Sequence, residues 1–169
     1  LTHLTPEHEY AASFARLLTV LLNLSLCYGL PEHCFTVEVI AYLAAQVADD
    51  GEFGASCADL LSVLPDAFDN SEIGDYDSYV SLSDYFTPKV VSVLVAQLAV
   101  GTRGSCQNCL KVLKPLCKRK ILGLAESCPP ELVVGLALRV RENHDTAWLH
   151  AYFLALLAEH LPGSELAEY

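Results

Sequence analysis

Apolar residues recur at spacings of three and four along most of this chain, which is the period of α-helices that bury one face. The first run extends from Pro6 to Tyr28, ends at Gly29 and is apolar on more than one side, so it predicts a central helix packed on several sides. Later runs begin near residues 31, 56, 88, 106, 130 and 146. The pattern predicts about seven helices and no hairpin strand.

Helix-starting residues stand before several of these runs. Thr87-Pro88 pairs a side chain that accepts a hydrogen bond with a proline that suits the first helical position. This cap favours a buried helix over a strand for the valine-rich run that follows. Ser56-x-x-Asp59 resembles a capping box and predicts a short helix closed by Pro65.

Short connections between the runs predict that consecutive helices pack antiparallel. The resulting helix pairs span roughly 40 to 50 residues, the unit size of HEAT and armadillo stacks. No repeat consensus is matched residue by residue. The fold class is therefore all-α, either a HEAT- or armadillo-like stack or a compact helical bundle. We expect one all-helical domain over residues 1–169, and the absence of methionine indicates a fragment or processed part of a larger protein.

One long connection interrupts this plan between residues 66 and 86. It is acidic, interleaved with aromatic residues, and contains no basic residue; its candidate site residues are Asp69, Glu72, Asp75 and Asp77. Such a connection is either a solvated excursion with one helical turn at Tyr79 to Leu82, or a segment that docks on a basic surface of this chain or of another.

Composition excludes some classes of partner. The net charge of −11 argues against nonspecific binding to nucleic acid or to anionic membranes, because the whole-molecule field repels polyanions. No apolar run reaches the roughly 18 residues of a membrane span. Seven cysteines, mostly within helical patterns, favour reduced thiols and an intracellular location in the cytoplasm or nucleus.

Residues 101–128 form a basic segment in this acidic chain. They hold six of the ten basic residues and one acidic residue, a formal charge of +5. They also hold four cysteines, whose spacing invites a zinc site: Cys106, Cys109, Cys117 and Cys128. At about 100° per residue, the first three fall on the same side as the leucines, so we interpret them as core residues. No bound metal or cofactor is expected.

The opposite side of this helix carries Lys111, Lys114 and Lys118, extended by Arg119, and we call these four residues the lysine ridge. The ridge is either a solvated face or a docking surface for an acidic or phosphorylated segment. Pro115 predicts a kink or restart after it. Trp148 and Tyr152 lie one turn apart in the last helix; core packing is their simplest role, and lining a partner groove is the alternative.

No catalytic constellation or phosphate-binding loop is present in the sequence, so we expect no enzyme. The leading hypothesis is a non-enzymatic scaffold or adaptor within a larger complex. It would bind another protein through an apolar groove and the lysine ridge, with an amphipathic helix as a further kind of partner, and self-association stays open. An alternative is a helical regulator of the Bcl-2 kind, viral ones included, in which a central helix is wrapped by others. A zinc-dependent module ranks last.

Overall fold

The computed structural model describes residues 11–25, 35–69, 82–119, 128–142 and 145–160. These residues form eight helices and no strand, which confirms the all-α prediction. The helices are α1 (Ala11–Ser25), α2 (Val37–Gln46), α3 (Glu52–Asp69), α4 (Leu82–Tyr85), α5 (Pro88–Val100), α6 (Arg103–Lys118), α8 (Pro130–Arg141) and α9 (Ala147–His160).

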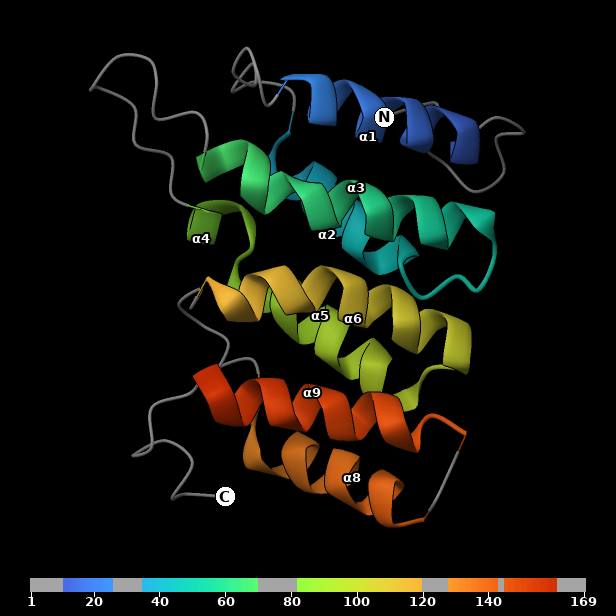
Figure 1. Cartoon of the computed structure of the whole chain (residues 1–169), viewed down its shortest axis with the longest axis vertical. Coiled ribbons are helices and arrows are strands. Elements are labelled where there is room, and N and C mark those ends of the chain that lie inside the picture. The colour runs from blue at the N-terminus through green and yellow to red at the C-terminus, as the bar shows by residue number, and fades with distance from the viewer. Residues whose placement is uncertain (1–10, 26–34, 70–81, 120–127, 143–144, 161–169) are drawn as a thin grey trace.

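The long helices lie in two layers (Figure 1). Helices α1, α3, α6 and α9 follow one another in the front layer, and α2, α5 and α8 lie behind them in the same order. Each rear helix packs antiparallel to the next helix of the chain, giving the pairs α2–α3, α5–α6 and α8–α9. This is a stack of helix pairs, one of the two predicted arrangements, and not a bundle around a central helix.

The buried positions repeat from one pair to the next. In the front layer, the same i, i+3, i+7 spacing places fully or almost fully buried residues on all three paired helices: Cys57, Leu60 and Leu64; Cys106, Cys109 and Leu113; His150, Phe153 and Leu157. The rear layer repeats the spacing with Ile40, Leu43 and the C-cap residue Val47 at α2 and with Val91, Leu94 and Leu98 on α5. Each pair therefore offers the next one an equivalent apolar stripe.

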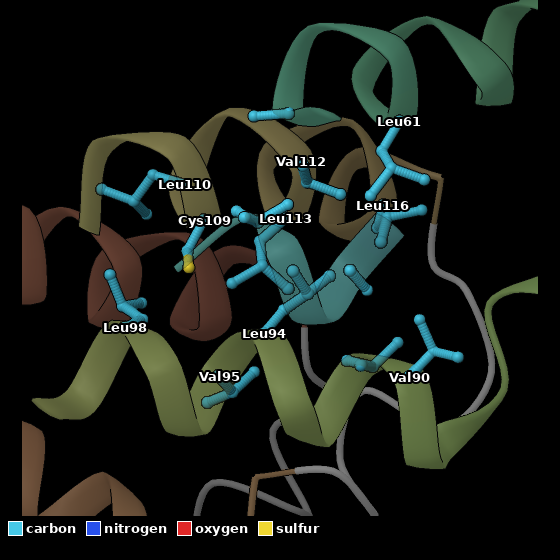
Figure 2. Packing of buried hydrophobic residues seen from close by; sticks show 14 of the residues in the cluster. Leu61, Val90, Leu94, Val95, Leu98, Cys109, Leu110, Val112, Leu113 and Leu116 are labelled. Atoms are coloured by element: carbon cyan, nitrogen blue, oxygen red, sulfur yellow. The ribbon is translucent and has the colours of Figure 1, made fainter. Parts of the chain in front are cut away.

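Side chains of α6 fill the space in front of α5 (Figure 2). Cys109 and Leu113 of α6 and Leu94 and Leu98 of α5 are all fully buried, and the Cys109 sulfur lies among the leucines in this view. Burial of this kind contributes roughly 1.5 to 3 kcal/mol per large apolar side chain. The assignment of the cysteine stripe to the core is confirmed.

Polar contacts join neighbouring pairs at their ends. The Asp50 carboxylate, in the turn after α2, accepts hydrogen bonds from the Thr102 hydroxyl and, at 2.7 Å, from the backbone N–H of Ser105. An acid from one pair thereby caps the front helix of the next. The Leu98 carbonyl accepts from the Cys106 thiol at 3.2 Å and lies 3.0 Å from Nε2 of the buried His150, where α5, α6 and α9 meet.

Two sequence predictions about the first helices are wrong. Helix α1 lies at the edge of the front layer against α3, and Leu17 and Val20 are about half exposed, so it is not a central helix. The central-helix arrangement of the Bcl-2 alternative is therefore not found among the described helices. The capping box is also absent, because α3 begins at Glu52 and continues through Pro65 to Asp69.

The early start of α3 has a local cause. The Asp49 side chain accepts a hydrogen bond from the Gly54 N–H, which is one of the donors that a helix start leaves without an intrahelical partner. Ser56 lies one turn inside the helix, where its hydroxyl donates to the Glu52 carbonyl at 2.7 Å. It is a buried helix residue and not the cap.

Candidate functional site: the face of α6 and α9

Helix α6 separates its side chains as the helical phase predicts. Thr102 caps its N-terminus through a hydrogen bond from the Ser105 N–H. Lys111, Lys114 and Lys118 are exposed, whereas the cysteines and leucines of the same helix are buried. The predicted restart at Pro115 is wrong, since α6 continues through this residue and ends at Lys118, while the alternative of a kink stays a prediction.

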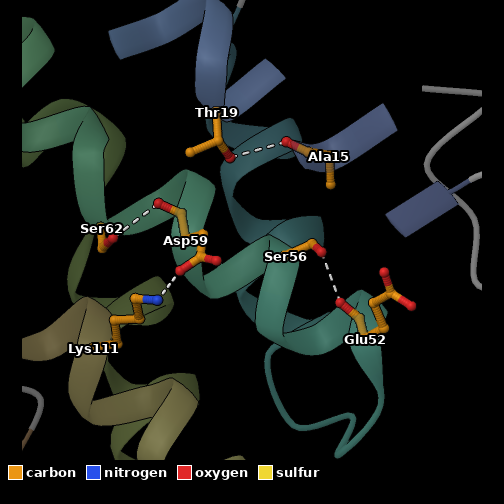
Figure 3. Close-up of polar contacts among 7 residues, drawn as sticks. All are labelled: Ala15, Thr19, Glu52, Ser56, Asp59, Ser62 and Lys111. Carbon is orange, nitrogen blue, oxygen red and sulfur yellow. Dashed lines mark hydrogen bonds and ion pairs between the residues drawn. The ribbon is translucent and has the colours of Figure 1, made fainter. Parts of the chain in front are cut away.

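The lysine ridge is divided by contacts with α3. The Lys111 ammonium forms an ion pair with the Asp59 carboxylate (Figure 3), and the Arg119 guanidinium forms another with Asp66. At about 100° per residue, Arg119 is turned about 80° from Lys111 on the α3 side of the helix, and Lys114 about 60° the other way. Half of the ridge therefore holds two helices of the stack together.

In the other half of the ridge, Lys114 faces α9 and Lys118 is exposed to solvent. The Lys114 ammonium lies 5.8 Å from the centre of the Tyr152 ring, within the range of a cation–π contact. Lys118 is exposed one turn further along α6, between the other two lysines in helical phase, about 20° from Lys111 and 40° from Lys114. Among the described residues neither lysine has an ion pair, so both positive charges are offered to solvent on this side.

Trp148 and Tyr152 project from the exposed face of α9. Trp148 is 54% exposed and Tyr152 is 39% exposed, so the core role is wrong and the surface role is the one that their positions allow. The other exposed residues in the middle of this helix are alanines, Ala151 and Ala155, so the two rings stand above their surroundings. Lys114, Lys118, Trp148 and Tyr152 together make up what we call the α6–α9 face.

The acidic connection begins later than predicted. Residues 66–69 are the last turn of α3, so Asp66 and Asp69 belong to a helix, and Leu82–Tyr85 form α4. Tyr85 and Phe86 are buried in the core and are not docking aromatics. The candidate acids Glu72, Asp75 and Asp77 lie outside the described residues. Asp66 forms an ion pair with Arg119 from within α3, and docking of the acidic connection itself stays a prediction.

The described cysteines form no disulfide and lie buried in apolar surroundings. Burial raises the pKa of Cys109 and of Cys117 to about 12, because the thiolate would lose its hydration. Burial also raises the pKa of Cys57 and of Cys128 to about 12. Within the described ranges, no three histidine, cysteine or acidic side chains come together as metal ligands. Metal binding would require deprotonated sulfur at positions where the fold favours the neutral thiol.

Sequence reasoning missed Asp59 as a partner of the ridge, and it placed Asp66 in the acidic connection and not in a helix beside the ridge. A signal for them exists, since these acids are seven residues apart on α3 and their partners Lys111 and Arg119 are eight apart on α6. Matching charges at nearly equal spacing on two helices indicate facing rows, once the two helices are known to be neighbours.

Comparison with protein-family models, curated proteins and solved structures finds no match. The functional argument therefore rests on the geometry of this chain. No helix in the described part of the chain is both long and apolar enough to cross a membrane.

Proposed function

We propose that the protein is a non-enzymatic interaction module, a scaffold or adaptor subunit that binds another protein through the α6–α9 face. The observation that carries this proposal is the exposure of Trp148 beside the Lys114–Tyr152 contact. Tryptophan and tyrosine are the residues most enriched among those that dominate the binding energy of protein interfaces. Hydration of an exposed tryptophan ring is unfavourable in free energy, and a partner that covers the ring would remove this cost.

The charge pattern supports a protein partner over a polyanion. In a chain of net charge −11, two exposed lysines give local attraction without general affinity for nucleic acid or anionic lipid. Lysines at the edge of an aromatic cluster would steer a partner and fix its register, and the rings would supply most of the affinity. The buried neutral thiols favour a reducing compartment, so we place the protein in the cytoplasm or nucleus.

The test compares two matched pairs of exposed apolar residues. Trp148→Ala with Tyr152→Ala removes the aromatic part of the α6–α9 face. Val134→Ala with Leu138→Ala is the control, because these residues are also one turn apart and are 49% and 48% exposed on the neighbouring helix α8. Each tagged chain is purified from the cells that produce the protein, and copurifying proteins are quantified by mass spectrometry.

We expect the α6–α9 variant to lose at least one copurifying protein that the α8 variant retains at wild-type levels. Circular dichroism and thermal unfolding check that both variants fold. Identical sets of copurifying proteins for the wild type and both variants would refute the proposal.

A further inference from the structure

We infer that the α6–α9 face recognises a short acidic peptide segment in which one apolar residue and two carboxylates lie in a row, each about one helical turn from the next, with the apolar residue at one end. This inference rests on the proposed function and adds the chemistry of the partner. It follows from the order of four side chains along two neighbouring helices and from the way the ridge is divided.

The order of the four side chains sets the order of the partner's residues. Helices α6 and α9 run in the same direction in the front layer (Figure 1). Trp148 comes first along this direction, Tyr152 and Lys114 meet one turn later, and Lys118 lies one turn beyond Lys114. Each step of four residues is about 6 Å, which equals i, i+4 in a bound helix and is close to i, i+2 in an extended strand.

The groups at each step set the chemistry. Trp148 offers an exposed ring, and among the described residues no cation lies over it, which suits an apolar side chain. Lys114 and Lys118 offer ammonium groups without ion pairs among the described residues, which suit carboxylates. A carboxylate on Lys114 would also lie beside the electropositive edge of the Tyr152 ring.

The ion pair of Arg119 favours carboxylate over phosphate as the acidic group of the partner. Arginine recognises phosphate through two parallel N–H donors, which a lysine lacks. The only arginine of the ridge, Arg119, is paired with Asp66 and its side chain is 25% exposed. The two lysines left for a partner are point charges about 6 Å apart, which two separate carboxylates match better than one doubly charged group.

The α3 side of the ridge excludes an alternative register. Lys111 and Arg119 face Asp59 and Asp66, so an acidic segment on that side would meet two carboxylates as well as two cations. On the α9 side the exposed residues nearest to Lys114 are the Tyr152 ring and alanines, and the exposed acid of α9, Glu159, lies about two turns beyond Tyr152. An acidic segment is therefore repelled from the α3–α6 boundary and accepted at the α6–α9 boundary.

The experiment selects a phage-displayed library of random 12-residue peptides on the full-length chain and measures the affinity of enriched peptides by fluorescence polarisation. We expect enriched peptides to contain an apolar residue and two acids at the stated spacing, with the apolar residue at one end of the row in either chain direction. Lys114→Glu with Lys118→Glu should weaken their binding at least tenfold, and Trp148→Ala should do the same. Lys111→Glu with Asp59→Lys, which exchanges the charges of an internal pair, should change it less than threefold.

Other outcomes overturn the inference in distinguishable ways. Enriched peptides without acids would contradict the inference if their affinity is unchanged by Lys114→Glu with Lys118→Glu but falls with Trp148→Ala. The proposed function would still stand. Failure of every enriched peptide to respond to Trp148→Ala or to the lysine reversal contradicts both. Peptides with phosphoserine in place of the acids should bind no better. Tenfold tighter binding of these peptides would show that the face recognises phosphate and not carboxylate. Equal binding by a synthetic peptide of residues 66–84 would make this chain its own ligand and overturn an external partner.

Discussion

The ammonium of Lys111 on α6 is ion-paired with the carboxylate of Asp59 on α3, so this lysine links two helices of the stack. The side chains are 52% and 39% exposed, and solvent screening keeps such a pair weak. In a double-mutant cycle with Lys111→Ala and Asp59→Ala, we expect a coupling of about 0.5 kcal/mol in the free energy of unfolding. Urea denaturation of the four proteins measures it.

The control for this cycle pairs Asp59→Ala with Lys114→Ala, because Lys114 faces α9 and not α3. No coupling is expected there. Equal coupling of Asp59 to both lysines would show that the ridge is not divided.

The cap that Asp50 provides predicts a larger effect. Its carboxylate accepts hydrogen bonds from the Thr102 hydroxyl and the Ser105 N–H across the boundary between two helix pairs. Asp50→Ala removes this cap and should lower the free energy of unfolding by about 1 to 2 kcal/mol. Glu142→Ala, an exposed acid at the C-terminal end of α8, serves as the control and should change it by less than about 0.5 kcal/mol. Chemical denaturation compares the two; equal effects would rule out the capping role.

Two glycines inside helices should respond to alanine in opposite directions. A Cβ at Gly54 would lie 2.0 Å from the Asp49 carbonyl oxygen, so Gly54→Ala must displace backbone and should destabilise the fold. A Cβ at Gly135 on α8 would meet nothing within 4 Å, so Gly135→Ala should stabilise by about 0.5 to 1 kcal/mol through helix propensity. Melting temperatures decide the matter, and a shift of the same sign for both variants would contradict this packing.

The buried thiols predict a loss of stability in alkali. The pKa of Cys57, Cys109, Cys117 and Cys128 rises from 9.0 to about 12 on burial. Above pH 9 the unfolded chain therefore loses protons that the folded chain keeps, so the free energy of unfolding falls as the pH rises from 9 towards 12. The loss should be roughly 1 kcal/mol per thiol at pH 10.

The measurement for the thiols compares urea denaturation at pH 7 and pH 9.5 in the wild type and in Cys57→Ala. The variant starts less stable, yet it should lose less stability between the two pH values because it has one buried thiol fewer. An unchanged pH dependence would mean that Cys57 does not contribute through its pKa.

The helices themselves could be predicted because their signals are local. Thr87 caps α5 and accepts a hydrogen bond from the Val90 N–H, as the Thr87-Pro88 pattern predicts. The start of α3 could not be predicted from Ser56, because the donor that needs a cap belongs to Gly54 and is satisfied by Asp49 five residues earlier. The edge position of α1 was missed because apolarity shows how much a helix can bury and not whether a neighbour covers it.

The candidate site could be predicted only in part, because the sequence sets which face of a helix is polar but not which helix lies beside it. Helical phase places the lysines opposite the leucines, and the structure agrees. Phase alone does not identify the helix beside each lysine, so the separate roles of Lys111 and Lys114 depended on the order of helices in the layer. The i, i+3, i+7 stripe of each helix was readable in the sequence, but the same spacing marks the buried face of a helix in a stack and in a bundle, so it does not separate the two arrangements.

Trp148 gives the most direct test of the α6–α9 face, because it is the only tryptophan of the chain and its side chain is half exposed. Acrylamide quenching of its fluorescence is measured in the free protein and in the complex purified from the native source. The signal of Trp148 is separated from that of the partner by using a partner without tryptophan or by labelling Trp148 with 5-fluorotryptophan. Binding at this face should lower the quenching constant at least threefold and shift the emission to shorter wavelength. A quenching constant that is the same in the free and bound states would contradict the proposal that partners bind there.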